Sequence, residues 1–164
     1  MQTRLHRWRL DLVSGAVAEE QLSERITEFG MINPGYTGRK YRYAYAATGM
    51  PSWFLFDGLV KHDLQTGAEE RFAFGEGVYG SETAMAPRVG STSEDDGYLV
   101  TLTTDMNADA SYCAVFDAAR VADGPACKLK LPERISSGTH SAWAAGSDLR
   151  RWGTAESAAD AIGL

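Results

Sequence analysis

The stretch His62-Asp63-Leu64-Gln65-Thr66-Gly67 predicts a tight turn between two β-strands. Strand-like runs flank it on both sides, from Gly58 to Leu64 and from Ala68 to Phe74. A carboxylate at the start of such a turn can accept backbone N–H groups, and the glycine at its end can adopt a positive φ. We therefore expect a β-hairpin in which Asp63 shapes the turn and has no catalytic role.

Similar turns recur along the chain at a regular spacing. Asp11, in Asp11-Leu12-Val13-Ser14-Gly15, lies 52 residues before Asp63, and Asp117, in Phe116-Asp117-Ala118-Ala119-Arg120, lies 54 residues after it. A period of about 50 residues in a chain of short strands is typical of β-propeller blades, which are four-stranded sheets. We expect each hairpin to form the outer part of one blade.

The remaining sequence also predicts short strands and turns. Leu5 to Val13 alternates in polarity, while Tyr98 to Thr104 and Ser111 to Asp117 are rich in residues that favour strands. No segment before Leu149 repeats its apolar residues at helical spacing over three turns. The predicted fold class is therefore all-β.

The number of blades limits what this chain can form. At the observed spacing its 164 residues supply about three blades, whereas propellers close with roughly four to eight. The first alternating strand begins at Leu5 without a preceding turn. We expect an incomplete fragment, with C-terminal propeller blades over residues 1–145. Residues 146–164 are expected to be a tail whose alanine-rich part, Thr154 to Ile162, forms a short helix or frays.

Composition excludes several classes of protein. The net charge is −6 and no run of Lys or Arg exceeds two residues, which argues against a nucleic-acid or anionic-membrane surface. No apolar run approaches the roughly 20 residues of a transmembrane helix, and the N-terminus lacks the apolar core of a signal peptide. A cytoplasmic protein is predicted. Cys113 and Cys127 are expected to be buried free thiols on strands.

Two carboxylates lie inside strand-like, largely apolar runs. Glu28 lies in the run from Ile26 to Pro34, and Glu82 lies 54 residues later in the run from Gly80 to Arg88. Burying a carboxylate is costly unless a cation or a hydrogen-bond donor meets it. Either glutamate alone is adequately explained by a surface or turn position. Their equal place in the blade repeat suggests two acids that point toward one axis.

The stretch Ser136-Ser-Gly-Thr-His140-Ser-Ala-Trp143 holds the one histidine, of three, that we expect to lie away from a hydrated surface. A histidine in such a setting is a candidate metal ligand. His6 and His62 are predicted to be exposed and to have no ligand role.

Several short motifs follow one another along the chain. They are Glu28-Phe29, Ile32-Asn33-Pro34, Gly38 to Tyr45, Phe56 to Lys61, Gly80-Ser81-Glu82, Glu94 to Leu99, Leu131 to Arg134 and Gly138 to Trp143. In this order and spacing they resemble the C-terminal third of the carotenoid cleavage oxygenases, a family that includes lignostilbene dioxygenases and a retinoid isomerase. The resemblance covers about Thr3 to Trp143.

The resemblance implies a seven-bladed propeller that holds a non-haem Fe(II) ion on its axis with four histidines. By motif, His140 resembles the last ligand, Glu82 resembles the glutamate hydrogen-bonded to it, and Glu28 resembles a glutamate that serves a histidine upstream of this chain. Neutral imidazoles bind Fe(II) and leave sites open for O2, while a carboxylate on the other ring nitrogen fixes the tautomer. The implied reaction is oxidative cleavage of a conjugated C=C bond, although some members isomerise their substrate instead.

The resemblance also implies partners, and the sequence departs from the family pattern at a few positions. The partners are an apolar conjugated small molecule, which is a carotenoid, apocarotenoid or stilbenoid, together with O2 and the missing N-terminal blades of the same domain. Peripheral contact with a membrane would give access to such a substrate. Thr139 and Ser141 replace the Phe and Gly that usually flank the ligand, and Thr83 replaces the usual Pro after the glutamate.

Two hypotheses follow. In the first, the chain is the C-terminal segment of an Fe(II) dioxygenase and is inactive alone, because three of the four ligand histidines are absent. In the second, it is a non-catalytic truncated β-sheet module, or a pseudoenzyme relic, that acts through protein contacts at its open strand edges.

Overall fold

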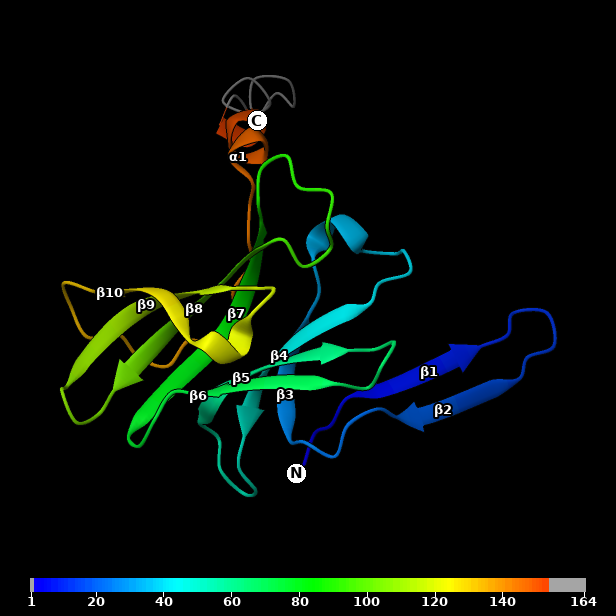
Figure 1. Ribbon diagram of the computed structural model, residues 1–164, viewed down its shortest axis with the longest axis horizontal. Coiled ribbons are helices and arrows are strands. Elements are labelled where there is room, and N and C mark those ends of the chain that lie inside the picture. Colours follow the sequence, from blue (N-terminus) through cyan, green and yellow to red (C-terminus); the bar gives the residue numbers. More distant parts are fainter. Residues whose placement is uncertain (1, 154–164) are drawn as a thin grey trace, which may run out of the picture.

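The computed structural model describes residues 2–153, which form antiparallel strands with little helix (Figure 1). Short 3-10 helices occupy Pro34–Tyr36 and Val121–Asp123. The expected all-β fold is confirmed, while the segment Thr154 to Ile162, for which the sequence predicts a short helix or a frayed tail, lies outside the described residues. The elements are β1 (His6–Leu10), β2 (Val17–Gln21), β3 (Thr27–Met31), β4 (Tyr43–Gly49), β5 (Phe56–Asp63), β6 (Glu69–Ala73), β7 (Val78–Pro87), β8 (Gly97–Asp105), β9 (Ala110–Asp117), β10 (Pro125–Lys130) and α1 (Gly146–Gly153).

The strands are organised as two successive blades and a hairpin. Strands β3 to β6 form one antiparallel meander, and β7 to β10 repeat the same arrangement. The two meanders join at a single residue pair, Phe56 opposite Gly80. Strands β1 and β2 form a separate two-stranded hairpin that projects to one side (Figure 1). Two four-stranded blades and the outer hairpin of another account for the expected blade count.

The turn role predicted for the repeated aspartates is confirmed. Asp11 and Asp63 each accept, through Oδ1, the amides of the second and third residues that follow. Gly67 has a φ of 77° and donates its amide to the carbonyl oxygen of Asp63. Asp117 accepts one such amide. Asp105, the last residue of β8, makes the same pair of contacts, so this turn chemistry is also used between the second and third strands of a blade.

The hydrophobic core lies where the two blades meet. It contains Tyr45 and Leu59 from the first blade and Met85, Leu99 and Phe116 from the second, all at most 1% exposed. The Tyr45 hydroxyl donates to the carbonyl oxygen of Ala118 over 3.1 Å, and burial raises the pKa of this phenol. Because the core draws on both blades, apolar packing fixes their relative position.

Two expectations about side-chain burial are wrong. His62 is only 3% exposed because it lies on β5, a central strand with five consecutive buried residues. His6, on β1, is half-buried. Cys127 is exposed, since it lies on the edge strand β10, all of whose residues are exposed. Cys113, on β9, is half-buried. Both thiols are free.

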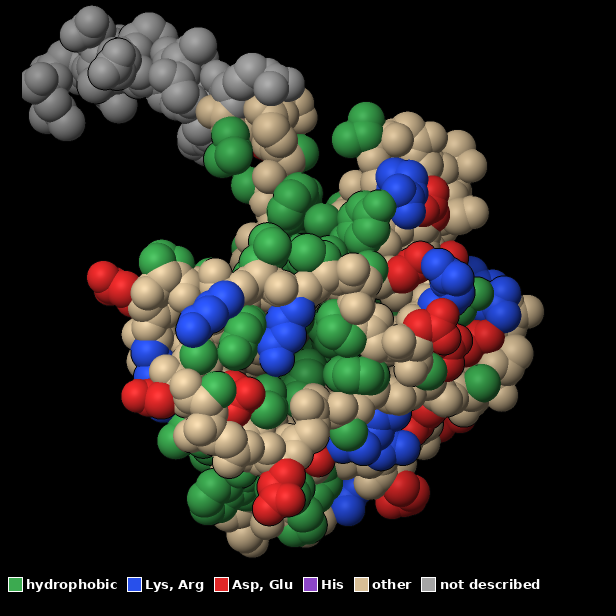
Figure 2. Space-filling model, turned by 60° about the vertical axis from the view of Figure 1, so that its left-hand side comes forward, with side chains coloured by type: hydrophobic (Ala, Val, Ile, Leu, Met, Phe, Trp, Pro, Cys, Tyr) green, Lys and Arg blue, Asp and Glu red, His purple; other side chains and the backbone are tan. Residues whose placement is uncertain are grey.

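Charges of both signs are mixed with hydrophobic side chains on the face shown in Figure 2. The exposed hydrophobic residues of β8, of β10 and of the turn after β8 include Leu102, Leu129 and Met106. Within residues 2–153, no helix has the length and apolar character needed to cross a membrane.

Candidate metal centre

Glu28 and Glu82 lie on the first strands of the two blades, each at a shift in strand register. In β3 the pairing with β4 shifts register between Glu28 and Met31, and in β7 the pairing with β8 shifts between Gly80 and Thr83. Such β-bulges place an extra residue in one strand and turn its side chain out of the normal alternation. The bulge of β7 includes Glu82, whereas Glu28 is the last paired residue before the bulge of β3 and lies opposite Ala47.

The loop that follows β10 returns across β7 and brings His140 to Glu82. Gly138 lies against Ser81, where an added Cβ would be 3.4 Å from the Ser81 Cβ. The Nδ1 atom of His140 lies 3.2 Å from Oε2 of Glu82. The amide of Ser141 donates to the same oxygen over 2.6 Å, and the Ser141 hydroxyl donates to the Glu82 carbonyl oxygen over 3.3 Å. The expected contact between the ring and the carboxylate is thus present.

The contact determines the tautomer of His140 at neutral pH. An ionised carboxylate can only accept hydrogen bonds, so Nδ1 carries the proton that it donates to Glu82. The lone pair of a neutral ring then lies on Nε2, the atom left to bind a metal ion. The side chain of Glu82 is 15% exposed, whereas that of His140 is 82% exposed. The expectation that His140 lies away from the hydrated surface is therefore wrong for the described residues, because its loop runs over the surface of β7.

An aromatic cluster adjoins His140 on the side of the first blade. The ring of Phe29, whose backbone has a φ of 57° at the bulge of β3, packs edge to face 5.6 Å from the His140 ring. It also packs 5.1 Å from the ring of Phe56. Phe29 was not foreseen as a site residue, although its place directly after Glu28 in the motif is the signal that could have identified it.

A cavity of about 500 Å³ lies beside this cluster. Phe29, Phe56 and Glu28 line it together with Trp53 and Phe54, whose exposed fractions are 55% and 71%. The Glu28 side chain is exposed, and within residues 2–153 it has no hydrogen-bond partner. The structure thus brings His140 and Glu82 together but leaves Glu28 apart from both. Across these same residues, no group of three or more His, Cys, Asp or Glu side chains is arranged to hold a metal ion.

Comparison with known proteins identifies the family. The family described as retinal pigment epithelial membrane protein matches residues 1–145. The carotenoid 9,10(9',10')-cleavage dioxygenase 1 of Pisum sativum is 32% identical over 83% of this chain and 28% of its own length. The lignostilbene-alpha,beta-dioxygenase isozyme III of Sphingomonas paucimobilis is 33% identical over 88% of this chain and 32% of its own length.

Solved structures match at the level of the fold. The cobalt-substituted apocarotenoid oxygenase of Synechocystis superposes with a TM-score of 0.81 and 29% identity, over 86% of this chain and 30% of that protein. The lignostilbene dioxygenase of Pseudomonas brassicacearum gives the same TM-score with 28% identity, over 87% and 32%. This chain therefore spans about 30% of the length of the relatives it matches. On the family match over residues 1–145, the chain belongs to the carotenoid cleavage oxygenase family.

Proposed function

We propose that this chain supplies one ligand, His140, to an Fe(II) centre that cleaves a conjugated C=C bond of a carotenoid, apocarotenoid or stilbenoid with O2. The observation that carries the proposal is the contact between His140 and Glu82, in a chain whose relatives are named carotenoid and lignostilbene dioxygenases. The described residues contribute one histidine to this centre. The remaining ligands, and the blades that bear them, belong to residues outside this chain.

The donor set suits Fe(II). A neutral imidazole is a ligand that iron accepts, and a carboxylate on its other nitrogen raises ligand basicity and fixes the ring. The bound metal would supply activation of O2. Glu82 is well placed for its role because the bulge of β7 aims the side chain, and the Ser141 amide holds the same carboxylate oxygen over 2.6 Å.

The aromatic side chains provide the apolar part of the site. Phe29 packs against the face of the first blade next to His140, and its ring would restrict water at that side of the ligand. The cavity beside it, lined by Phe56, Trp53 and Phe54, has a volume suited to part of a long conjugated molecule. Aromatic rings bind such a molecule through dispersion and stacking.

Glu28 is assigned the same task as Glu82, but toward a histidine that this chain does not contain. Its exposed carboxylate, next to the bulge of β3, supports this assignment. We further propose a cytoplasmic location, with peripheral contact with a membrane as the route to an apolar substrate.

Paramagnetic NMR tests the ligand role directly, even when binding is weak. Titration of the 15N-histidine-labelled chain with Co(II), a paramagnetic substitute for Fe(II), should shift and broaden the ring signals of His140 before those of His6 or His62. The diamagnetic ion Zn(II) is the control, because it should shift the same signals without paramagnetic broadening. His62 is an internal reference, since its ring is buried.

The outcome separates the two hypotheses. Selective broadening at His140 that weakens in the Glu82→Gln variant supports the metal role. Equal effects at His6 and His140, or none at His140, would contradict it and favour a non-catalytic sheet module that contacts another chain through its open edges.

A further inference from the structure

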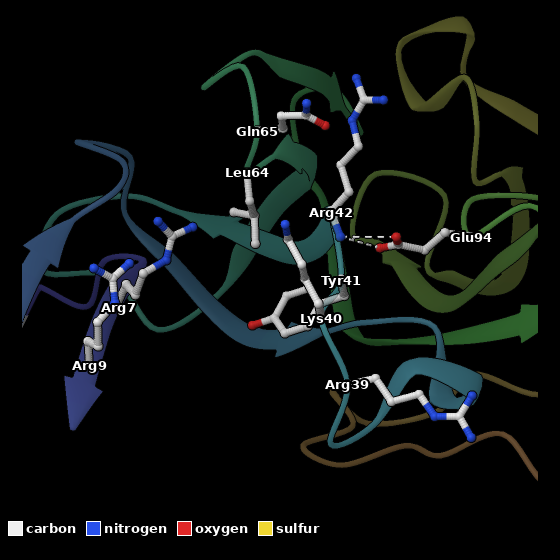
Figure 3. Close-up of a pocket in the computed structure, with 9 residues that line it drawn as sticks. All are labelled: Arg7, Arg9, Arg39, Lys40, Tyr41, Arg42, Leu64, Gln65 and Glu94. Atoms are coloured by element: carbon white, nitrogen blue, oxygen red, sulfur yellow. Dashed lines mark hydrogen bonds between the residues drawn. The ribbon is translucent and has the colours of Figure 1, made fainter. Parts of the chain in front are cut away.

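A second, strongly basic cavity lies away from the candidate metal centre. It has a volume of about 740 Å³ and opens between the β1–β2 hairpin, the loop before β4 and the turn after β5 (Figure 3). We call it the basic cleft. Its lining residues are Arg7, Arg9, Arg39, Lys40, Tyr41, Arg42, Leu64, Gln65 and Glu94.

The fold gathers these cations from separate parts of the sequence. Arg7 and Arg9 lie two residues apart on β1, so their side chains leave the same face of the hairpin. Arg39 and Lys40 come from the loop that leads into β4, about 30 residues further along the chain. The chain has a net charge of −6 and no Lys or Arg run longer than two. Five cations around one cavity are therefore an unusually high local density of positive charge for this protein.

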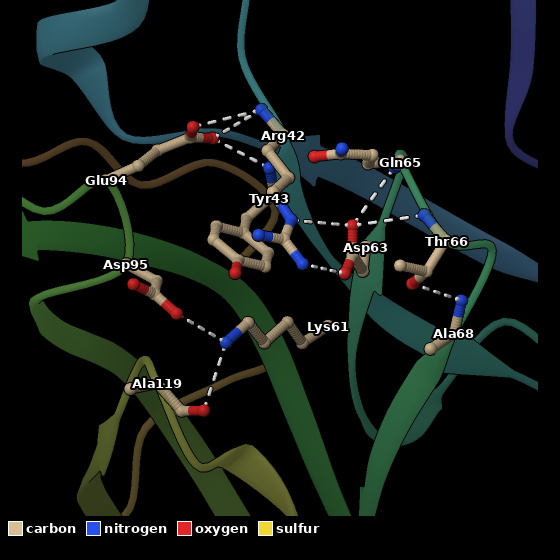
Figure 4. Close-up of polar contacts among 10 residues, drawn as sticks. All are labelled: Arg42, Tyr43, Lys61, Asp63, Gln65, Thr66, Ala68, Glu94, Asp95 and Ala119. Carbon is tan, nitrogen blue, oxygen red and sulfur yellow. Dashed lines mark hydrogen bonds and ion pairs between the residues drawn. The ribbon is translucent and has the colours of Figure 1, made fainter.

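The acids near the cleft are already engaged (Figure 4). The carboxylate of Glu94 accepts the amides of Arg42 and Tyr43 over 2.6 to 3.0 Å. The guanidinium of Arg42 forms a two-pronged pair with Asp63, at 2.9 and 2.6 Å, and holds the pKa of that carboxyl well below its ordinary value. The carboxylates of Glu94 and Asp63 thus both bind residues at the start of β4.

The remaining cations around the cleft have few acidic partners. Arg7 has one ion pair, with Glu20 at 3.4 Å and on the exposed surface of the hairpin. Arg9, Arg39 and Lys40 have no ion pair within the part of the chain that the structure describes. Like charges that share a cavity repel one another, and this repulsion disappears when an anion lies between them.

The wall that carries Tyr41 and Arg42 is held in place from the neighbouring blade. Asp95, in the loop between β7 and β8, accepts a hydrogen bond from Lys61 over 2.8 Å, and the Lys61 ammonium lies 4.3 Å from the centre of the Tyr43 ring (Figure 4). Glu94 of the same loop binds the amide of Arg42. Because these contacts are made between residues of the protein itself, the wall of the cleft is preorganised.

We propose that the basic cleft binds a phosphate-bearing anion. Guanidinium groups match phosphate oxygens with two parallel hydrogen bonds, and an ammonium adds a point charge. Arg7, Arg9 and Lys40 offer both kinds of group, and the hydroxyl of Tyr41, a residue 41% exposed, adds a donor. The volume exceeds that of one phosphate group, so the cleft has room for a further organic part or a second phosphate. This site is independent of the proposed oxygenase function.

Binding of inorganic pyrophosphate to the 164-residue chain, measured by calorimetry at two salt concentrations, tests the proposal. We expect a one-to-one complex that weakens with salt and that weakens about tenfold or more in the Arg9→Gln/Lys40→Gln variant. The matched control is Lys128→Gln/Lys130→Gln, which removes the same charge from exposed positions on β10. Circular dichroism establishes that both variants keep the fold of the parent chain.

The binding measurements can overturn the proposal, and vesicles can identify the kind of phosphate that binds. Equal loss in the two variants, or no pyrophosphate binding by the parent chain, overturns the proposal. Vesicles of phosphatidylcholine with and without phosphatidic acid identify the source of the phosphate. Binding only to the acidic vesicles, with release by pyrophosphate, indicates a lipid headgroup, whereas pyrophosphate binding without vesicle binding indicates a soluble phosphate ester.

Discussion

Replacing Lys61 by methionine should destabilise the fold far more than removing an exposed cation. Lys61 lies on β5 with its side chain only 6% exposed, and its ammonium donates to Asp95 over 2.8 Å and to the carbonyl oxygen of Ala119 over 3.0 Å. Methionine keeps most of the aliphatic stem, so the change removes the charge and both donors while leaving the packing largely intact.

The magnitude follows from the burial of the two partners. Removing one member of a buried ion pair costs roughly 3 to 5 kcal/mol, because the other charge is left without compensation. The Asp95 side chain is 22% exposed, so water relieves part of that cost. We expect the free energy of unfolding to fall by about 3 kcal/mol, the lower end of this range.

Urea unfolding followed by circular dichroism measures the change. An unchanged slope of the unfolding free energy against urea concentration shows that the variant exposes the same surface area on unfolding as the parent chain. Arg120→Met is the control, because the side chain of Arg120 is 68% exposed and its pair with Asp117 should contribute nothing measurable. The double variant Lys61→Met/Asp95→Asn should regain part of the loss. A loss below about 1 kcal/mol for Lys61→Met, or a double variant no more stable than the single one, would refute the reasoning.

Three further predictions use other parts of the molecule. Gly58→Ala places a Cβ 2.2 Å from a backbone oxygen of β6 and should cost roughly 1 to 3 kcal/mol in urea unfolding, whereas Gly30→Ala, which meets no atom within 4 Å, should cost far less. Burial lowers the pKa of His62 below 6.5, so the unfolded chain binds a proton more readily than the folded chain, and the free energy of unfolding should fall as the pH drops below 6.5. A His62→Gln variant whose unfolding free energy depends on pH in the same way between pH 8 and pH 5.5 would contradict this. Glu82→Gln should weaken Co(II) binding at His140 about tenfold and shift its ring 15N signals toward a mixture of tautomers; unchanged signals would exclude the orienting role.

The hairpins could be predicted from the sequence because their determinants are local. An aspartate that binds the amides two and three residues later, followed by a glycine at positive φ, needs no information from distant residues. The contact of Glu82 with His140 was also expected, but only through the family motifs. Nothing in composition or spacing alone brings residues 58 positions apart together.

The features that could not be predicted depend on cross-strand register and on neighbouring strands. The bulge beside Glu28 and the bulge that includes Glu82 arise from the pairing of β3 with β4 and of β7 with β8, which alternation within one strand does not reveal. The burial of His62 and the exposure of Cys127 follow from the places of β5 inside the sheet and of β10 at its edge. The basic cleft combines residues from β1 and from the loop before β4, which no sequence run connects.

The single pair that joins the two blades has a mechanical consequence. Only Phe56 and Gly80 pair between β5 and β7, so side-chain contacts hold the blades together, among them Met31 against the Met85 amide and Lys61 with Asp95. Because protein interiors are close-packed, a change of volume in this seam would shift one blade relative to the other. The two glutamates lie on opposite sides of the seam. Their separation is therefore adjustable by substitutions that touch neither of them.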